Sequence, residues 1–197
     1  MGRLSHCSMK QQLNILDQAV ICLRQGGVIA YATESVFGLG CDPDNRASVE
    51  RLLRIKQRPV EKGLILVAAE IQQLEPYLNL ALVPDARMAD VLASWPGPHT
   101  WVIPASERAP RWITGAFDSI AVRISAHPQV RALCQYWGKP LVSTSANLSG
   151  QAPCRTDVDT LSVLGEQLDY VLPGVVGGAL NPSQIRDAIS GNVLRPA

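Results

Sequence analysis

The sequence contains no long hydrophobic run, and this absence excludes several classes of protein. No apolar stretch approaches the roughly 18 residues that are needed to span a bilayer. The N-terminal segment MGRLSHCSMKQQ lacks the apolar core of a signal peptide, and His6 stands where a myristoylation site requires Ser or Thr. We therefore expect a cytoplasmic protein with no membrane contact.

Cysteines are few, and the common nucleotide-binding motifs are missing. The five cysteines are widely spaced and include no C-x-x-C pair, which argues against a zinc site or a redox motif and fits a reducing compartment. Neither G-x-G-x-x-G nor the Walker motif G-x-x-x-x-G-K-[ST] occurs, so any nucleotide site must be of another design. No Ser-His-Asp arrangement or metal-ligand spacing stands out.

Length and composition indicate one globular domain. The chain has 197 residues, of which 47% are hydrophobic and 18% charged, so it can bury a sizeable core. We find no repeat, low-complexity tract or linker, and we expect a single domain over 1–197 in which 1–10 form an N-terminal tail.

Hydrophobic periodicity predicts alternating helices and strands, and therefore an α/β sheet. Ser8 and Gln11 resemble a capping box at the start of a helix that Gly26-Gly27 ends. A second helix is capped by Asn45 or Ser48 and ends before Pro59. Further helices are expected at 85–94, 128–137 and 157–167, and strands at 28–33, 64–69, 100–104, 119–124, 140–144 and 171–174, with a hairpin of 185–189 and 192–196.

Positive charge is concentrated in one segment. The formal net charge is +1, but residues 46–62 hold six cations against two acids. A local excess on a nearly neutral chain favours a focused anion site over a whole surface built for nucleic acid. Arg54, Lys56 and Arg58 fall at the end of the second predicted helix, where cations also complement the helix dipole; that alternative explains one or two of the charges.

The segment KPLVSTSANLSG, 139–150, offers a row of polar side chains. In an extended chain, Ser143, Ser145 and Asn147 share one face. At the carboxyl end of a parallel strand, followed by Gly150, such a row suits phosphate or ribose oxygens. Taken alone, the segment is more often an ordinary polar turn.

The segment IAYATESVFGLGCD, 29–42, places Thr33, Glu34 and Ser35 at another strand end, followed by a turn through Gly38 and Gly40. Glu34 is a base, a metal contact or an ordinary helix-start carboxylate, of which the last is the safest interpretation.

Arg123 lies in SIAVRIS, 119–125, on the face opposite Ile120, Val122 and Ile124. An arginine within a strand usually snorkels or pairs with an acid, but its planar fork also clamps carboxylates and phosphates.

Taken together, these segments resemble the YrdC-like family. ATESVFGLG, RIKQRPVEKGLIL, WPGPHT, SIAVR, STSANLSG and LRP occur in the family's order, and the likeness covers roughly residues 11–196. K-x-R-P and S-x-N are its most specific elements, and the family's short bacterial form fits best. The resemblance implies a single-domain, twisted, open, mixed sheet flanked by helices.

The resemblance also implies a nucleotidyltransferase. The expected reaction converts L-threonine, bicarbonate or CO2, and ATP with Mg2+ into L-threonylcarbamoyl-AMP and pyrophosphate. Partner proteins then transfer the threonylcarbamoyl group to tRNA, on the adenosine just 3′ of the anticodon.

Roles for individual residues follow from the same likeness. Lys56 and Arg58 are expected to be catalytic and, with Ser145 and Asn147, to bind the ATP phosphates. Further ATP contacts are Arg54, Ser119 and Arg195, and the expected threonine contacts are Thr33, Arg123, Ser143 and Ser183. The chain departs from the family pattern at Ala32, Ser35 and Phe37, and it has Ala68 near the position of a histidine in long members.

Two alternatives remain open. An RNA-binding module of translation or ribosome maturation would use the same cations, binding RNA weakly and without catalysis of its own, but it would not need the row of Ser143, Ser145 and Asn147. Carbamoyl-adenylate chemistry on another acceptor, as in hydrogenase maturation proteins, is less expected because their accessory domains are missing.

Overall fold

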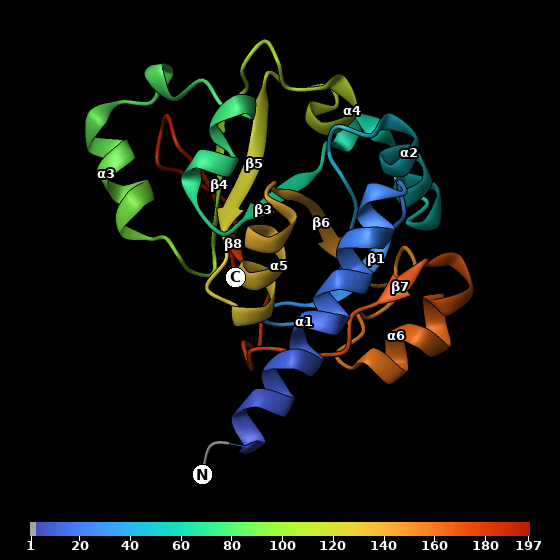
Figure 1. Cartoon of the computed structure of the whole chain (residues 1–197). Coiled ribbons are helices and arrows are strands. Elements are labelled where there is room, and N and C mark those ends of the chain that lie inside the picture. The colour runs from blue at the N-terminus through green and yellow to red at the C-terminus, as the bar shows by residue number, and fades with distance from the viewer. Residues whose placement is uncertain (1–2) are drawn as a thin grey trace.

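The computed structural model describes residues 3–197, with side chains from residue 14 onward (Figure 1). The helices are α1 (Arg3–Arg24), α2 (Arg46–Ile55), α3 (Asp85–Ala93), α4 (Arg111–Thr114), α5 (Pro128–Trp137) and α6 (Asp157–Leu164). The strands are β1 (Ile29–Ala32), β2 (Phe37–Gly40), β3 (Ile65–Ala68), β4 (His99–Pro104), β5 (Ser119–Ile124), β6 (Leu141–Ser145), β7 (Tyr170–Val171), β8 (Gln184–Asp187) and β9 (Val193–Arg195). Short 3-10 turns connect them at Val60–Lys62, Ile71–Gln73, Glu75–Tyr77, Leu80–Leu82 and Gly165–Gln167.

The nine strands form one sheet in the order β7-β1-β2-β6-β3-β5-β4-β8-β9. The pairs β1/β7, β3/β5 and β4/β8 are parallel, and the remaining pairs are antiparallel. The prediction of an open, mixed α/β sheet flanked by helices is therefore confirmed. The expectation of a parallel strand before the S-x-N element was wrong, because β6 runs antiparallel to both of its neighbours.

The two faces of the sheet carry separate hydrophobic clusters, as the two-residue period of a strand requires. In β1, Ile29 and Tyr31 pack in the cluster formed with α1 and α5, whereas Ala30 and Ala32 pack in the cluster that contains α2. Figure 1 shows α1 and α5 side by side over the first of these faces. Each fully buried aliphatic side chain stabilises the fold by about 1.5–3 kcal/mol.

Strand β2 was not expected, since its sequence FGLG resembles a turn. It pairs with β1 and β6, and Gly40 is required by close approach of neighbouring chain rather than by a turn. A Cβ atom at Gly40 would lie 2.6 Å from the Val142 carbonyl oxygen and 2.7 Å from Cε1 of Tyr31. The predicted turn is in fact the short connection 33–36, which joins β1 to β2.

The first helix begins earlier than the predicted capping box. It starts at Arg3, so the segment 3–10, which we expected to be a tail, is helical, and Ser8 lies inside the helix. The segment contains no Gly or Pro, so a helix anchored by its packed second half propagates toward the N-terminus. Residues 1 and 2 of the expected tail lie outside the described residues.

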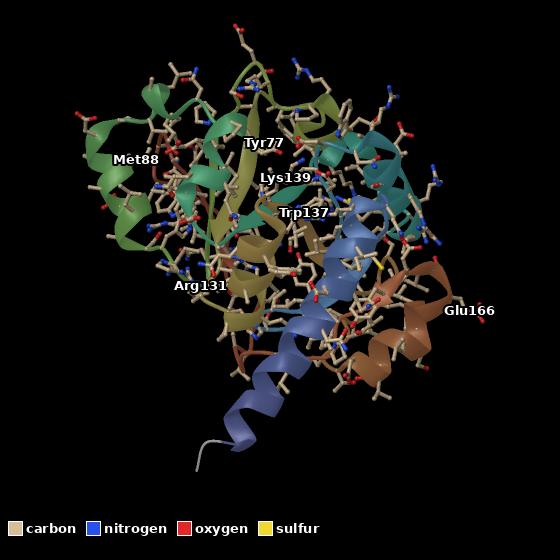
Figure 2. The ribbon with its side chains drawn as sticks, in the orientation of Figure 1. Tyr77, Met88, Arg131, Trp137, Lys139 and Glu166 are labelled. Carbon is tan, nitrogen blue, oxygen red and sulfur yellow. The ribbon has the colours of Figure 1, made fainter. Side chains whose placement is uncertain are left out.

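Polar side chains tie together loops at the ends of central strands, among them Tyr77 and Lys139 (Figure 2). The Tyr77 hydroxyl donates to Asp44 Oδ1 at 2.7 Å, and Lys139 Nζ donates to Asp44 Oδ2 at 2.9 Å. Arg131 of α5 donates to the Ala69 carbonyl at 2.9 Å, which fixes the helix to the end of β3. No helix within the described residues is long and apolar enough to cross a membrane.

Candidate active site

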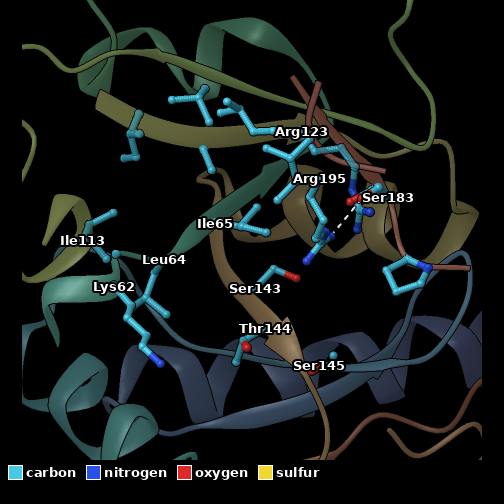
Figure 3. A pocket seen from close by; sticks show the side chains of 18 of the residues that line it. Lys62, Leu64, Ile65, Ile113, Arg123, Ser143, Thr144, Ser145, Ser183 and Arg195 are labelled. Carbon is cyan, nitrogen blue, oxygen red and sulfur yellow. Dashed lines mark hydrogen bonds between the residues drawn. The ribbon is translucent and has the colours of Figure 1, made fainter. Parts of the chain in front are cut away.

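A cavity of about 650 Å³ opens over the part of the sheet that α1 and α5 leave uncovered (Figure 3). Its floor follows from strand register: one residue from each of five adjacent strands faces the cavity in a single cross-strand row. The row consists of Ser143, Ile65, Ala121, Val102 and Asp187, from β6, β3, β5, β4 and β8. Two residues further along β3, Val67 pairs with Leu141 of β6 on one side and with Arg123 of β5 on the other. Val67 and Leu141 belong to the hydrophobic cluster under α5, so Arg123 lies at the boundary between this cluster and the cavity.

The cavity is strongly basic. Four cationic side chains line it, from the loop after α2, from β5 and from β9, while the lining contains a single carboxylate, Asp187. Figure 3 shows Lys62 on one side of the cavity and Arg123 and Arg195 together on the other. Such a concentration of positive charge over hydroxyl groups from β6 favours a ligand with several negative charges. The four cations are Arg58, Lys62, Arg123 and Arg195.

Arg58 enters the lining through the way α2 ends. Gln57 has φ of 48°, in the left-handed region, and the Arg58 N–H bonds the Leu53 carbonyl at 3.0 Å, which together form a Schellman turn. This turn directs Lys56 and Arg58 to different sides. Arg58 then donates from Nε and Nη2 to the Gly63 carbonyl at 3.3 and 2.9 Å, so its guanidinium braces the loop that carries Lys62.

Lys56 lies beneath the cavity rather than in its lining. Its Nζ donates to three oxygens, the carbonyls of Ser145 (2.7 Å) and Asn147 (2.6 Å) and Asn147 Oδ1 (2.6 Å). Three bonds use all the donors of an ammonium group. Burial, and after it the positive charge of Arg58, lower the pKa of Lys56 to about 8. Lys56 therefore shapes the turn that follows β6.

The S-x-N element is divided by the end of β6. Ser145 is the last residue of the strand and lines the cavity, whereas Asn147 lies beyond it and outside the lining. Asn147 Oδ1 accepts from Ser145 Oγ at 2.7 Å, and its Nδ2 donates to the carbonyls of Leu148 and Gln151. The amide thus holds the turn and orients the Ser145 hydroxyl. The expected one-sided row of three side chains ends at Ser145.

The residues expected to contact threonine come together at the Arg123 end of the cavity. Thr33 and Ser143 lie in the lining and are both buried, and Thr33 Oγ1 donates to the Val36 carbonyl at 2.7 Å. Ser183 also lines the cavity, and its hydroxyl is paired with Thr100 Oγ1 at 2.8 Å. These four residues come from four separate segments, which only the folded sheet brings together.

Of the remaining predicted ATP contacts, two line the cavity and one lies outside it. Ser119 and Arg195 line the cavity, and Arg195 Nη2 donates to the Ser183 carbonyl at 2.8 Å. Burial, and then the positive charge of Arg123, lower the pKa of Arg195. Arg54 is exposed in a shallow depression on α2 beside Glu50, outside the cavity.

Sequence reasoning missed two features of the site. Lys62 points into the cavity, although it belongs to the basic segment 46–62 that the charge count had singled out. Glu34 forms an ion pair with Arg123, with 3.3 Å between Oε2 and Nη2. Neither partner's position could be inferred from a spacing, because 89 residues separate them in the chain.

The described residues do not form a metal cage. No group of three or more His, Cys, Asp or Glu side chains is placed to hold an ion in this part of the chain. A magnesium ion here would depend on oxygens of a bound phosphate chain, which is how proteins commonly hold it.

The fold and the cavity define a class: α/β proteins with a basic cavity on one face of an open mixed sheet. A family model described as "Telomere recombination", Sua5_yciO_yrdC, matches residues 22–197. The chain belongs to this Sua5/YciO/YrdC family, so the resemblance seen in the sequence is confirmed.

Relatives cover nearly the whole chain. A threonylcarbamoyl-AMP synthase of Stenotrophomonas maltophilia is 58% identical over 180 residues, which are 91% of this chain and 97% of the relative. One of Yersinia pestis is 56% identical over 189 residues, 95% of this chain and 99% of the relative.

A solved structure shares the fold. Sua5 of P. abyssi in complex with L-threonine superposes with a TM-score of 0.82 at 30% identity over 89% of this chain. This chain spans about half of that longer protein, 51% of its length.

Proposed function

We propose that the chain is a threonylcarbamoyl-AMP synthase, which joins L-threonine, a one-carbon unit from CO2 or bicarbonate, and the AMP portion of ATP. The observation that carries the proposal is a single cavity with two chemically different ends. Arg123, Ser143 and Thr33 form an end suited to a small amino acid, while Arg58, Lys62 and Ser145 form an end suited to phosphates. The relatives at 56–58% identity bear the name of this activity.

Amino-acid recognition would rest on Arg123. A guanidinium binds a carboxylate through two parallel hydrogen bonds and fixes its orientation as well as its charge. The hydroxyls of Thr33 and Ser143 can then contact the remaining polar groups of threonine. The amine must be neutral to attack, so the ammonium group first loses a proton to solvent. Attack of the neutral nitrogen on CO2 then forms the N–C bond, and a second proton leaves to solvent to give the carbamate.

Nucleotide activation would rest on positioning and charge. A carbamate oxygen attacks the α-phosphorus of ATP, the bond from that phosphorus to the bridging oxygen breaks, and pyrophosphate leaves. Arg58 and Lys62 neutralise the phosphate chain, and the Ser145 hydroxyl donates to it after exchanging its hydrogen bond to Asn147 Oδ1 for one to a phosphate oxygen. Lys56 and Asn147 would contribute by holding the turn that presents Ser145. Mg2+, when bound to the ATP oxygens, would further neutralise the leaving group.

A labile carbamate requires protection from water, and the β7–β8 connection supplies a cover on one side. The N–H groups of Gly177 and Ala179 donate to the carbonyls of Thr33 and Glu34, both at 2.9 Å. Because the product is an activated mixed anhydride, we further propose that proteins which transfer its acyl group to tRNA consume it.

Incubation of the purified protein with L-threonine, ¹³C-bicarbonate and ATP tests the proposal. Mass spectrometry should detect threonylcarbamoyl-AMP carrying the label, together with one pyrophosphate per product. Omission of threonine is the matched control and should abolish both. Hydrolysis of ATP without the labelled adduct would overturn the proposal.

A further inference from the structure

Glu34 is a largely buried carboxylate that the reaction as described does not use. It lies in the connection between β1 and β2, and 14% of its side chain is exposed. Its Oε1 accepts hydrogen bonds from the Ser125 hydroxyl at 2.6 Å and from the Ala126 N–H at 3.2 Å. The carboxylate is therefore anchored to the chain that follows β5, independently of any ligand.

Its other oxygen, Oε2, faces Arg123. The distance to Arg123 Nη2 is 3.3 Å, and Arg123 has 11% of its side chain exposed. Burial alone would raise the pKa of Glu34, but the charge of Arg123 and the hydrogen bond from Ser125 outweigh it, so the pKa is lowered. Glu34 is therefore ionised at neutral pH, and both side chains of the pair lie largely out of water.

Apart from Glu34, the surroundings of Arg123 do little to hold its guanidinium in one orientation. Arg195 is a second cation at the same end of the cavity, as Figure 3 shows. Arg123 Nε is buried and has no hydrogen-bond partner among the described residues. Without Glu34, repulsion from Arg195 would act on a guanidinium that no acid restrains.

Direct contact between Glu34 and a substrate does not fit the geometry. Glu34 is absent from the cavity lining, and its Oε2 atom is buried behind Arg123. Whatever Glu34 does for a ligand in the cavity, it must do through the arginine.

We propose that Glu34 is a positioning residue that holds the Arg123 guanidinium with its remaining N–H groups turned toward the cavity, and so sets the affinity for the amino-acid carboxylate. The inference rests on the proposed function for the identity of the ligand. Glu34 Oε2 faces Nη2 on one side of the guanidinium, which leaves the remaining Nη donors pre-oriented before threonine arrives.

The Glu34→Gln variant tests this link, because it keeps an oxygen for Ser125 and Ala126 but removes the charge. We expect the KM for threonine to rise about tenfold or more, while the KM for ATP changes by less than about twofold. Glu34→Asp, which keeps the charge on a shorter arm, should recover part of the threonine affinity. Asp169→Asn is the matched control: it removes the ion pair with Arg51 near the opposite end of β1 and should leave both KM values unchanged.

A double-mutant cycle separates positioning from an independent role. In an Arg123→Met background, Glu34→Gln should add little to the loss of threonine affinity, because the residue through which it acts is gone. The inference would be overturned if the two substitutions reduced threonine affinity by independent factors that multiply in the double variant. It would also be overturned if Glu34→Gln raised the KM for threonine and the KM for ATP equally.

Calorimetric titration of threonine, with and without ATP, gives the same comparison without turnover. If the wild-type protein binds threonine but makes no adduct, the proposed function fails while the Glu34 inference can still be judged. If Glu34→Gln lowers the melting temperature too far to assay, Glu34→Asp carries the comparison, and unchanged threonine affinity in that folded variant would overturn the inference.

Discussion

At the scale of single residues, the cations of the site divide into those already bound to the chain and those with free donors. Lys56 gives all three of its hydrogen bonds to the turn after β6, and Arg58 gives two to the Gly63 carbonyl. Lys62 makes no ion pair or side-chain hydrogen bond with the described residues and is exposed at the cavity. Cations that are close together in the sequence therefore have different roles: Lys56 and Arg58 hold backbone in place, whereas Lys62 is available to a ligand.

Arg123 should separate amino-acid recognition from nucleotide recognition. We expect Arg123→Ala to raise the threonine requirement about tenfold or more, since a carboxylate loses its bidentate partner, with Arg123→Lys recovering only part. ATP binding should persist because Arg58, Lys62 and Ser145 remain in place. Calorimetric titration of each ligand measures both effects; a collapse of ATP binding with threonine binding unchanged would assign Arg123 to the nucleotide.

Lys56 gives a prediction for the pH dependence of stability. Its pKa in the folded protein is lowered to about 8, whereas an unfolded lysine has a pKa of about 10.4. Between these values the unfolded chain binds more protons, so the free energy of unfolding rises with pH across this window.

We therefore expect the stability of the wild-type protein relative to Lys56→Met to be constant below about pH 7 and to grow between about pH 8 and pH 10. Urea denaturation of both proteins at stepped pH measures the difference. A difference that shrinks over this window would show that the three oxygens around Nζ outweigh burial.

At the scale of elements, local signals in the sequence located most helices and strands. The predicted helix 128–137 has the bounds of α5, because Pro128 starts it and Gly138 ends it. Asn45 caps α2 as predicted, with Oδ1 accepting from the Ser48 N–H. In contrast, β2 was missed because the need for Gly40 arises from β6, a strand about a hundred residues away. The direction of β6 depends on its neighbours in the same way.

The same distinction limits what could be predicted of the site. Thr33, Arg123 and Ser143 were predicted and do line the cavity, since their segments carry recognisable motifs. The engagement of Lys56 beneath the cavity and the pairing of Glu34 with Arg123 are tertiary contacts, which no local pattern encodes.

Gly40 and Gly165 form a matched pair for testing the close packing of β2. We expect Gly40→Ala to destabilise the protein by about 1–3 kcal/mol, because the new Cβ would meet backbone of β6 and the Tyr31 ring. Gly165→Ala has 3.6 Å to its nearest neighbour and should be neutral or slightly stabilising. Chemical denaturation of both variants measures this, and equal stability would contradict the proposed packing role of Gly40.

At the scale of the whole molecule, charge is balanced overall and concentrated locally. The formal net charge is +1, yet four cations line one cavity. A polyanion too large for the cavity can still contact its rim and the exposed Arg54. This arrangement favours steering of anions to one place over general adhesion to nucleic acid.

We therefore expect RNA to bind weakly and by counterion release. Its affinity should fall about tenfold or more between about 50 and 200 mM salt, without sequence preference, and ATP should compete. Fluorescence anisotropy with labelled RNA measures this. Sequence-specific binding that persists at high salt would support the RNA-binding alternative instead.

The cross-strand floor of the cavity has a consequence for biosynthesis. Its five residues are spread from Ile65 to Asp187, and Arg195 completes the wall, so the complete cavity exists only when nearly all of the chain has been made. Contacts this distant in sequence also form late, because loop closure must precede them. Binding of a ligand that contacts both Ser143 and Arg195 would therefore report completed assembly of the sheet.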